Sequence, residues 1–437
     1  MVKILTVVFF VMLNSLALAG EKTLTPQSFD RYKPSYIKVN AKGDIWVAYY
    51  DLKGVIHIRN LSKERELMVN EGRKAGSSGL AFDVQGDKAF VVWREKAHGK
   101  RLWFRASYDG GKTLTKPILI DEKTEALTRI KLASNFAGKV FVTWYGEARA
   151  GDSDYNIYCA SSNDFGRSFS EVKNLTLGYR HSIYPTLLAD EKGAYVFSYS
   201  GRQGKKYMIF RKTTGKNWSE ATEIKEIGVV TLFVEPIKIG NRLYVFWFNT
   251  YDGISIIEGA YSDDDGKTWK TEAFEDTRGL DVGLLRVAHD SKGHIYVAFY
   301  GKRKEKEKNK VYIMRSEDKG TTWKRPVPVR HYPFENTNAE GLDIIAQDNG
   351  EVVIAWVDYR NIRSNLYMQY SRDYGGTWHK KDIALEEPGR FNTRHFPYTD
   401  SLVKLKDRYY MLAYRFKNDL TLKEADLLLI DFILGEK

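Results

Sequence analysis

The sequence reads SEDKGTTW at residues 316–323, and four other segments repeat this pattern of Ser, Asp, Gly, Thr or Ser, and a large apolar residue. The copies are evenly spaced except for one gap that is twice as long as the others. Near the middle of that gap, at residues 211–218, the chain reads RKTTGKNW, which keeps the Gly and the Trp and lacks the Asp. We therefore expect a sixth, degenerate copy there. The complete copies are residues 107–114, 162–169, 262–269, 316–323 and 371–378.

Each copy has the chemistry of a tight turn. An Asp side chain can accept hydrogen bonds from backbone N–H groups two residues further on, and a Gly supplies left-handed backbone. The terminal aromatic residue adds apolar surface for packing. We therefore interpret the repeated carboxylates as structural rather than catalytic. They are Asp109, Asp164, Asp265, Asp318 and Asp373.

The residues around each copy follow one order: an apolar stretch, a polar turn, a second apolar stretch that ends in an aromatic residue, a variable loop and a third stretch. Short runs rich in Val, Ile, Tyr and Trp between turn signals predict strands. The repeated turn then leads to a fourth strand, and no segment has sustained helical periodicity. This order starts eight times, near Tyr36, Gly79, Arg129, Pro185, Glu235, Leu284, Gly341 and Ser401.

A unit of four strands cannot bury both its faces alone, so such units stack radially around an axis as the blades of a β-propeller. The sequence therefore predicts an all-β fold with four-stranded antiparallel blades, eight in number, with seven as the alternative. The last repeat shows three strands only, and we expect residues from about Thr23 to Phe29 to supply the fourth and close the ring. Residues 20–437 would then be one domain.

The first 19 residues have the features of a signal peptide. Lys3 gives a positive start, residues 4–13 are an apolar run, and Ala17 and Ala19 frame a small-residue cleavage site. The apolar run is shorter than the roughly 20 residues that span a bilayer. We therefore expect a secreted or periplasmic protein with no membrane span. Because Cys159 is the one cysteine, no intramolecular disulfide is possible.

The net charge of +12 favours anionic partners such as acidic glycans, and export makes nucleic acid an unsuitable one. The sequence contains no HExxH motif, no cysteine cluster, no GxSxG motif and no glycine-rich phosphate loop. We therefore expect no metal and no cofactor. The expected partner is a glycan or a protein, and the oligomeric state is left open.

The links between blades are where we expect a binding site. In an antiparallel blade, these links and the connections from strand two to strand three lie at the same end, and variable loops on a rigid scaffold carry binding residues. Three links contain an Arg-His pair followed by an aromatic residue and Pro. Either the three guanidinium groups converge on one anion, or each is solvated on its own loop. The residues are Arg180, His181 and Tyr184, then Arg330 and His331, then Arg394 and His395.

The repeated turn resembles the Asp-box, or BNR, repeat of the sialidase superfamily, and the resemblance spans nearly all of residues 20–437. It implies a propeller and, in the sialidases, arginines that hold a substrate carboxylate beside a Tyr and Glu pair. Glu235, in EPIKIGNR, resembles the catalytic Glu of that family, and Tyr398, in HFPYTDSL, resembles its nucleophile. A carboxylate base would activate the phenol, whose ordinary pKa is near 10.

The chain also departs from the sialidase pattern. No Arg-Ile-Pro motif precedes the first Asp box, no segment matches the acid/base Asp, and sialidases usually have six blades. The predicted function is therefore the binding of an anionic glycan or protein ligand at the loop face. The alternatives are an exo-glycosidase that resembles the sialidases and a structural assembly module.

Overall fold

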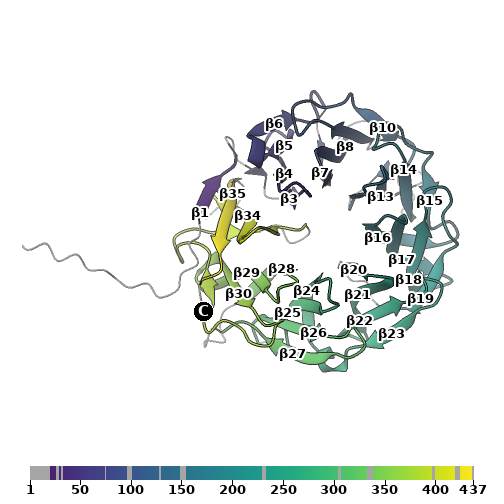
Figure 1. The fold of residues 1–437 in the computed structure, drawn as a ribbon. Coiled ribbons are helices and arrows are strands. Elements are labelled where there is room, and N and C mark those ends of the chain that lie inside the picture. Colours follow the sequence, from purple (N-terminus) through teal and green to yellow (C-terminus); the bar gives the residue numbers. More distant parts are fainter. Residues whose placement is uncertain are drawn as a thin grey trace, which may run out of the picture.

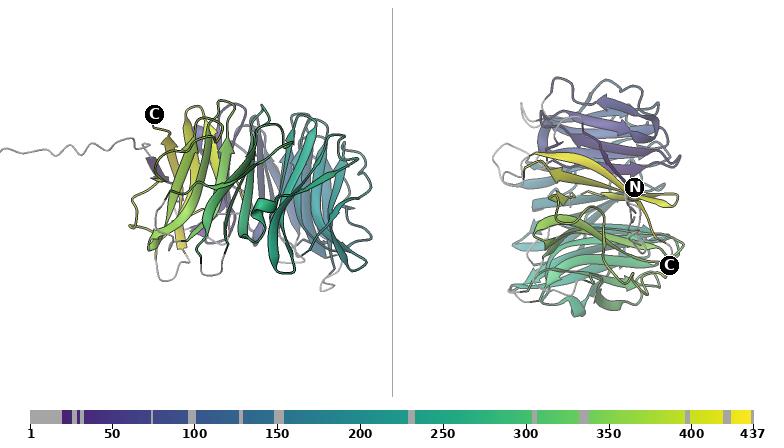
Figure 2. Two further views of the ribbon diagram at one scale, coloured as in Figure 1. Left: turned by 90° about the horizontal axis from the view of Figure 1, so that it is seen from below. Right: turned by 90° about the vertical axis from the view of Figure 1, so that its left-hand side faces the viewer.

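The computed structural model is a ring of eight antiparallel sheets around a central axis (Figure 1), so the predicted eight-bladed β-propeller is confirmed. Seen from the side, the blades stand next to one another around the ring (Figure 2). The two-to-three connections and the blade links define one end of the ring, here called the loop face, and the Asp boxes lie at the other end. The described residues are 20–25, 29–30, 33–73, 75–95, 101–126, 129–147, 154–228, 233–303, 307–331, 338–395, 399–418 and 424–435.

Blades 1 to 4 follow the chain in order, and the first strand of each blade lies next to the axis (Figure 1). Blade 1 contains β3 (Tyr36–Val39), β4 (Ile45–Tyr50), β5 (Ile56–Asn60) and β6 (Arg65–Met68), with the 3-10 turn η1 (Leu61–Lys63). Blade 2 contains β7 (Ala75–Gln85), β8 (Lys88–Glu95), β9 (Leu102–Ser107) and β10 (Ile118–Asp121). Blade 3 contains β11 (Glu125–Ala126), β12 (Lys131–Ser134), β13 (Val140–Glu147), β14 (Tyr155–Ser162) and β15 (Lys173–Asn174). Blade 4 contains β16 (Arg180–Ala189), β17 (Ala194–Arg202), β18 (Lys205–Thr213) and β19 (Thr222–Glu226).

Blades 5 to 8 repeat the same plan, and blade 8 joins both ends of the chain. Blade 5 contains β20 (Val234–Ile239), β21 (Arg242–Tyr251), β22 (Ile254–Ser262) and β23 (Lys270–Ala273), followed by η2 (Glu275–Thr277). Blade 6 contains β24 (Asp281–His289), β25 (Ile295–Lys302), β26 (Lys310–Ser316) and β27 (Lys324–Pro328). Blade 7 contains β28 (Ala339–Ala346), β29 (Val352–Asn361), β30 (Arg363–Ser371) and β31 (Ile383–Ala384). Blade 8 contains β1 (Gly20–Thr23), β2 (Phe29–Asp30), β32 (Thr393–Arg394), β33 (Leu402–Leu405), β34 (Arg408–Phe416) and β35 (Glu424–Ile433).

The apolar core lies between the blades. The second strand of a blade is covered by a neighbouring blade on each face, so its side chains are buried on both sides, as the burial of all six residues of β4 shows. Five second strands each bury one tryptophan completely, and buried clusters join every blade to the next around the ring. The tryptophans are Trp46, Trp93, Trp144, Trp247 and Trp356.

The N-terminal strand closes the ring, as the sequence predicted. β1 pairs antiparallel with β35 from Gly20, opposite Asp431, and β2 pairs with the start of the same strand. Between them the backbone N–H of Leu24 donates to the Leu427 carbonyl over 2.8 Å. The closing strand therefore begins a few residues earlier than expected, and it ties blade 8 to the beginning of the chain.

The Asp boxes form the expected turns. In the box at residues 316–323, the Ser316 hydroxyl donates to Asp318, and Gly320 N–H donates in turn to Ser316, each over 2.8 Å. Burial would raise the pKa of the Asp318 carboxyl, but hydrogen bonds from the Thr322 backbone and side chain lower it to about 2. In the degenerate copy, the Thr213 hydroxyl takes the role of the box serine and accepts a hydrogen bond from Gly215 N–H over 3.0 Å.

One assignment within the boxes was wrong: the turn carboxylate of the third complete copy is Asp264, not Asp265. Thr268 donates to Asp264 through its backbone N–H over 2.9 Å and through its hydroxyl over 2.6 Å. Asp265 instead forms an ion pair with Lys212 of blade 4 over 2.6 Å. The reason is geometric, since the residue before the box Gly is left-handed in all five boxes, and its side chain points away from the turn.

This correction can be tested with two neighbouring substitutions. We expect Asp264→Ala to lower the Tm by a few degrees, because several hydrogen bonds within the turn are lost. Asp265→Ala should leave the Tm almost unchanged, since an exposed ion pair contributes little. The measurement is thermal unfolding followed by circular dichroism. Equal effects of the two substitutions would contradict the assignment.

Candidate functional site

Polar side chains link each blade to the next around the axis. They come from the first strands of the blades and from the turns that follow those strands. All eight junctions are bridged, so most polar groups near the axis already have a structural role. The links run from Asn40 to the Gly86 carbonyl, Ser134 to Asp83, Asn135 to the Asp190 carbonyl, Lys238 to Asp190, Arg286 to Glu235, Ser291 to Asp348, Ser401 to Asp343 and Lys38 to Asp400.

A cavity of about 300 Å³, here called the axial cavity, lies within this belt and is lined by first strands of blades 1 to 6 and by residues just before β33. A smaller cavity of about 30 Å³ adjoins it on the side of the loop face and shares three of its charged residues. The polar residues that line the axial cavity are Tyr36, Lys38, Lys131, Thr186, Glu235, Arg286, Thr399 and Asp400.

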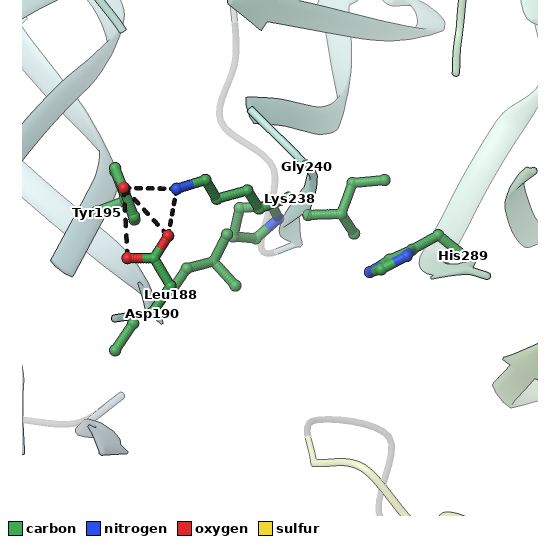
Figure 3. A pocket seen from close by; sticks show the side chains of 9 residues that line it. Leu188, Asp190, Tyr195, Lys238, Gly240 and His289 are labelled. Carbon is green, nitrogen blue, oxygen red and sulfur yellow. Dashed lines mark hydrogen bonds and ion pairs between the residues drawn. The ribbon is translucent and has the colours of Figure 1, made fainter. Parts of the chain in front are cut away.

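A third cavity of about 380 Å³ adjoins the axial cavity on the side of the Asp boxes, with Leu188 and Pro236 in both linings. Figure 3 shows its polar group: Lys238 donates to the Tyr195 hydroxyl over 2.6 Å and pairs with Asp190. His289 lies on the opposite wall. The three cavities therefore follow one another along the axis.

Glu235, predicted as a catalytic residue, lies in the axial cavity and is part of the belt. Its Oε1 accepts from Arg286 Nη1 over 3.0 Å, and Arg286 Nη2 donates to the Thr399 carbonyl over 3.1 Å. Burial raises the pKa of the Glu235 carboxyl, although Arg286 acts in the opposite direction. The pair thus joins blade 5 to blade 6 and to the chain that enters blade 8.

Asp400 and Lys38 form the second ion pair of the axial cavity, with Nζ and Oδ2 2.9 Å apart. The nearby Lys38 ammonium lowers the pKa of Asp400. Beside them, the Tyr36 hydroxyl donates to the Leu80 carbonyl over 2.7 Å. Both carboxylates that line the cavity therefore have a cation of their own.

Lys131 is the remaining charged side chain of the axial cavity. It lies at the start of β12, and blade 3 is linked to its neighbours through Ser134 and Asn135 instead. Within the part of the chain that the structure describes, its ammonium has no hydrogen bond and no ion pair. Burial lowers the pKa of Lys131, whereas the more distant Glu235 raises it. The cavity thus holds three cations against two carboxylates.

The first predicted Arg-His pair lies at the loop face of blade 4. The Arg180 side chain is 80% exposed, with Nε 3.7 Å from Asp154, and the backbone N–H of His181 donates to the same carboxylate. Tyr184 lines the small cavity together with Lys131, and the Arg129 guanidinium lies 5.5 Å from its ring. Of this predicted group, Tyr184 alone lines one of the three cavities, the small one.

The second pair is part of a buried network in blade 7. The Arg330 side chain is 4% exposed, and its Nε donates to Asp358 over 2.8 Å. Asp358 also pairs with Arg360. His331 contacts the Gln369 amide at 3.0 Å. These residues stabilise the loop face of blade 7 rather than facing the axial cavity.

The third pair lies between blades 7 and 8. Arg394 Nη1 is 3.4 Å from Glu340, which also accepts from the Tyr359 hydroxyl. His395 is buried, with Nδ1 3.3 Å from the Ser401 hydroxyl. Tyr398 lies outside the described residues. The three arginines thus have three different carboxylate partners. None of the three arginines lines the axial cavity. Their role in binding stays a prediction.

Three strained residues mark the loop-face side of the cavities. Most left-handed residues other than Gly occupy Asp boxes, hairpin turns or caps, but Arg129, His181 and Tyr184 lie where the chain enters blades 3 and 4. Their φ angles are 56°, 49° and 54°. Such backbone costs of the order of 1–3 kcal/mol per residue and concentrates at functional sites. The β16 register also shifts twice, between Arg180 and Thr186.

Sequence reasoning missed Lys38, Lys131 and Arg286. A signal was present, because each is a charged residue two positions after the start of its repeat, with Ile, Leu or Val on both sides. The first strand of every blade borders the axis, so a charge at that position faces the channel. Combining the repeat alignment with charge would therefore have found the axial site.

The comparisons with known proteins agree with this architecture. Residues 259–404 match the BNR repeat-like domain family. The structure resembles the polysaccharide lyase Uly1 (12% identity, TM-score 0.53, covering 96% of this chain and 100% of that chain). It also resembles a family PL25 ulvan lyase bound to -[GlcA(1-4)Rha3S]- (11%, 0.50, 84% and 95%) and the NanB sialidase from Streptococcus pneumoniae (10%, 0.39, 93% and 94%). No curated protein matches.

The fold and the family match define an eight-bladed β-propeller with a BNR repeat-like domain, which confirms the Asp-box resemblance. Among the described residues, no group of three or more His, Cys, Asp or Glu could hold a metal ion. In that same part of the chain, no helix is long and apolar enough to cross a membrane.

Proposed function

We propose that this propeller binds, in its axial cavity, a glycan that carries carboxylate or sulfate groups. The observation that carries the proposal is Lys131, a cation that lines the cavity and makes no hydrogen bond and no ion pair among the described residues. Because Glu235 and Asp400 are each neutralised by their own cation, an anionic ligand would meet a net positive lining. Charge-assisted hydrogen bonds in such a partly dry site are stronger than in water.

The similarity to known structures supports a glycan as the ligand. Two propellers that share this fold are named polysaccharide lyases, and one of them holds a glycan that contains glucuronate and sulfated rhamnose. Aromatic side chains also border the cavities, with Tyr36 beside the axial cavity and Tyr184 beside the small one.

We expect Lys131→Met to reduce the affinity for acidic glycans by about ten-fold or more, because one charge-assisted contact is lost. Isothermal titration calorimetry would compare a polyuronate, a sulfated polysaccharide and a neutral glucan. The glucan is expected to bind weakly, and the stronger of the two acidic glycans identifies the anion. Arg180→Ala, which removes an exposed cation outside the axial cavity, is the matched control.

A different pattern would overturn the axial site. If Lys131→Met binds as the unchanged protein does, and Arg180→Ala or Arg394→Ala loses binding, the ligand lies at the Arg-His loops instead. If no acidic glycan binds at all, the proposed function fails.

Hydrolysis of a glycoside is the second candidate function. It is favoured by the contact of the Tyr359 hydroxyl with Glu340 beside Arg394, which brings a phenol, a carboxylate and a guanidinium together. Release of methylumbelliferone from a sialoside or another glycoside tests it. Loss of that release in Tyr398→Phe or Tyr359→Phe would show which phenol acts.

Export of the protein is part of the same proposal, because acidic polysaccharides of this kind are extracellular polymers. Residues 1–19 carry the sequence features of a signal peptide and lie outside the described residues. N-terminal sequencing of the secreted protein should give Gly20 as the first residue. Retention of Met1 in an exported product would contradict cleavage at this site.

A further inference from the structure

The small cavity at the loop face is built differently from the axial cavity that it adjoins. Both are lined by Lys131, Thr186, Val234, Glu235 and Arg286, so a ligand atom at Lys131 is open to each. The small cavity adds Arg129, Tyr184, Pro185 and Phe233. On this side the small cavity therefore gains two aromatic residues, a proline and one guanidinium.

Tyr184 belongs to a cluster of tyrosines at the loop-face end of blades 3 and 4. The ring of Tyr145 lies edge-on to Tyr184, with centroids 6.2 Å apart, and edge-on to Tyr155, with centroids 5.9 Å apart. All three tyrosines are half-buried, so each is supported by its neighbours and still reaches the surface. Such a cluster offers a rigid apolar surface at low entropic cost.

The backbone of Tyr184 has a left-handed conformation that tyrosine disfavours. A left-handed tyrosine inside a strand is unusual, and β16 shifts its pairing register on both sides of Ile183 to accommodate it. Arg129, on the neighbouring link, is left-handed as well and faces the same ring. At Tyr184 the left-handed backbone coincides with this irregular pairing, and we take the orientation of the Tyr184 side chain as the feature that the strain maintains.

From these observations we infer that Tyr184 forms a second sugar subsite, which holds the residue next to the acidic one. This inference rests on the proposed binding of an acidic glycan at Lys131. The ligand is then an oligosaccharide in which an acidic residue in the axial cavity is followed by a sugar that lays its apolar C–H face against the tyrosine cluster at the open end of the small cavity, which is too small to enclose a sugar ring itself. Lys131 makes binding specific for an anionic sugar, and Tyr184 favours an oligosaccharide over a free sugar acid.

The test separates the two subsites with two probes, free glucuronate and a disaccharide of glucuronate linked to xylose. In calorimetric titrations we expect Tyr184→Ala to weaken disaccharide binding about ten-fold and to leave glucuronate binding within about two-fold. Lys131→Met should weaken both probes. Tyr184→Phe keeps the ring and should bind both as the unchanged protein does, and it also remains informative if Tyr184→Ala unfolds.

The outcomes distinguish the inference from the proposed function. If Tyr184→Ala binds the disaccharide as tightly as the unchanged protein does, or if Tyr184→Phe loses it, stacking on this ring is overturned while binding at Lys131 stands. If the unchanged protein prefers glucuronate to the disaccharide, the second subsite is overturned in the same way. Unaltered binding of both probes by Lys131→Met would instead refute the axial site itself.

Discussion

A chain that begins at residue 31 is expected to lose most of its folding stability relative to one that begins at Gly20. The deletion removes β1 and β2 and leaves one edge of β35 unpaired. It also removes Leu24, which is 2% exposed in the core between blades 8 and 1. Truncating one buried Leu to Ala costs about 2–5 kcal/mol, and the whole margin of a typical domain is about 5–15 kcal/mol. Urea unfolding of the two chains measures the loss.

Two point variants separate closure of the ring from simple shortening. Leu24→Ala should account for a substantial part of the loss, because it empties a buried site without removing backbone pairing. Lys22→Ala, at an exposed position of the same strand, should have almost no effect. If the truncated chain melts at the temperature of the longer one, then β35 does not need this partner and the ring closes in another way.

The architecture could be predicted because the same local turn chemistry recurs in six of the eight blades. The Ser-x-Asp-x-Gly turn is set by contacts within eight residues, so it can be recognised without knowledge of the rest of the fold. Even in the copy that lacks the Asp, Thr213 lies at the end of the third strand, where the complete boxes have Ser, and keeps the turn through its hydroxyl. The error at Asp265 arose where three aspartates follow one another; the Ser-x-Asp-x-Gly spacing already selects Asp264, and the left-handed backbone of Asp265 before Gly266 agrees with it.

The candidate site was harder to predict because the environment of each charge depends on other blades. Three identical Arg-His pairs have three environments, since Arg330 meets the buried Asp358 whereas Arg180 points to solvent. The sequence did direct attention to Glu235 and Tyr184, and both line the cavities near the axis. The repeat alignment marks Lys131 as an axial charge, but its lack of a hydrogen bond or ion pair can be seen only once the partners of the other axial charges are known.

Breaking the contact of Arg286 with Glu235 by substitution should show whether Glu235 has a structural or a catalytic role. We expect Arg286→Met to destabilise the fold by about 3–5 kcal/mol, because a buried carboxylate is left without its partner. Since burial already raises the pKa of Glu235, the variant can relieve this cost by taking up a proton. A raised carboxyl pKa in the folded state gives stability that is present at low pH and lost as the pH rises through that value. The variant should therefore lose more stability at neutral than at acidic pH.

The double variant Glu235→Gln, Arg286→Met completes this test. If the pair is a link between blades 5 and 6, removing both charges should restore much of the stability that Arg286→Met loses, since neither member of the pair is left as an unpaired ion. Urea unfolding at two pH values measures this for the unchanged protein, both single variants and the double variant. A catalytic Glu235 gives the opposite result: Glu235→Gln would keep its stability and abolish glycoside turnover. Because the guanidinium also holds the Thr399 carbonyl, recovery in the double variant is expected to be large but incomplete.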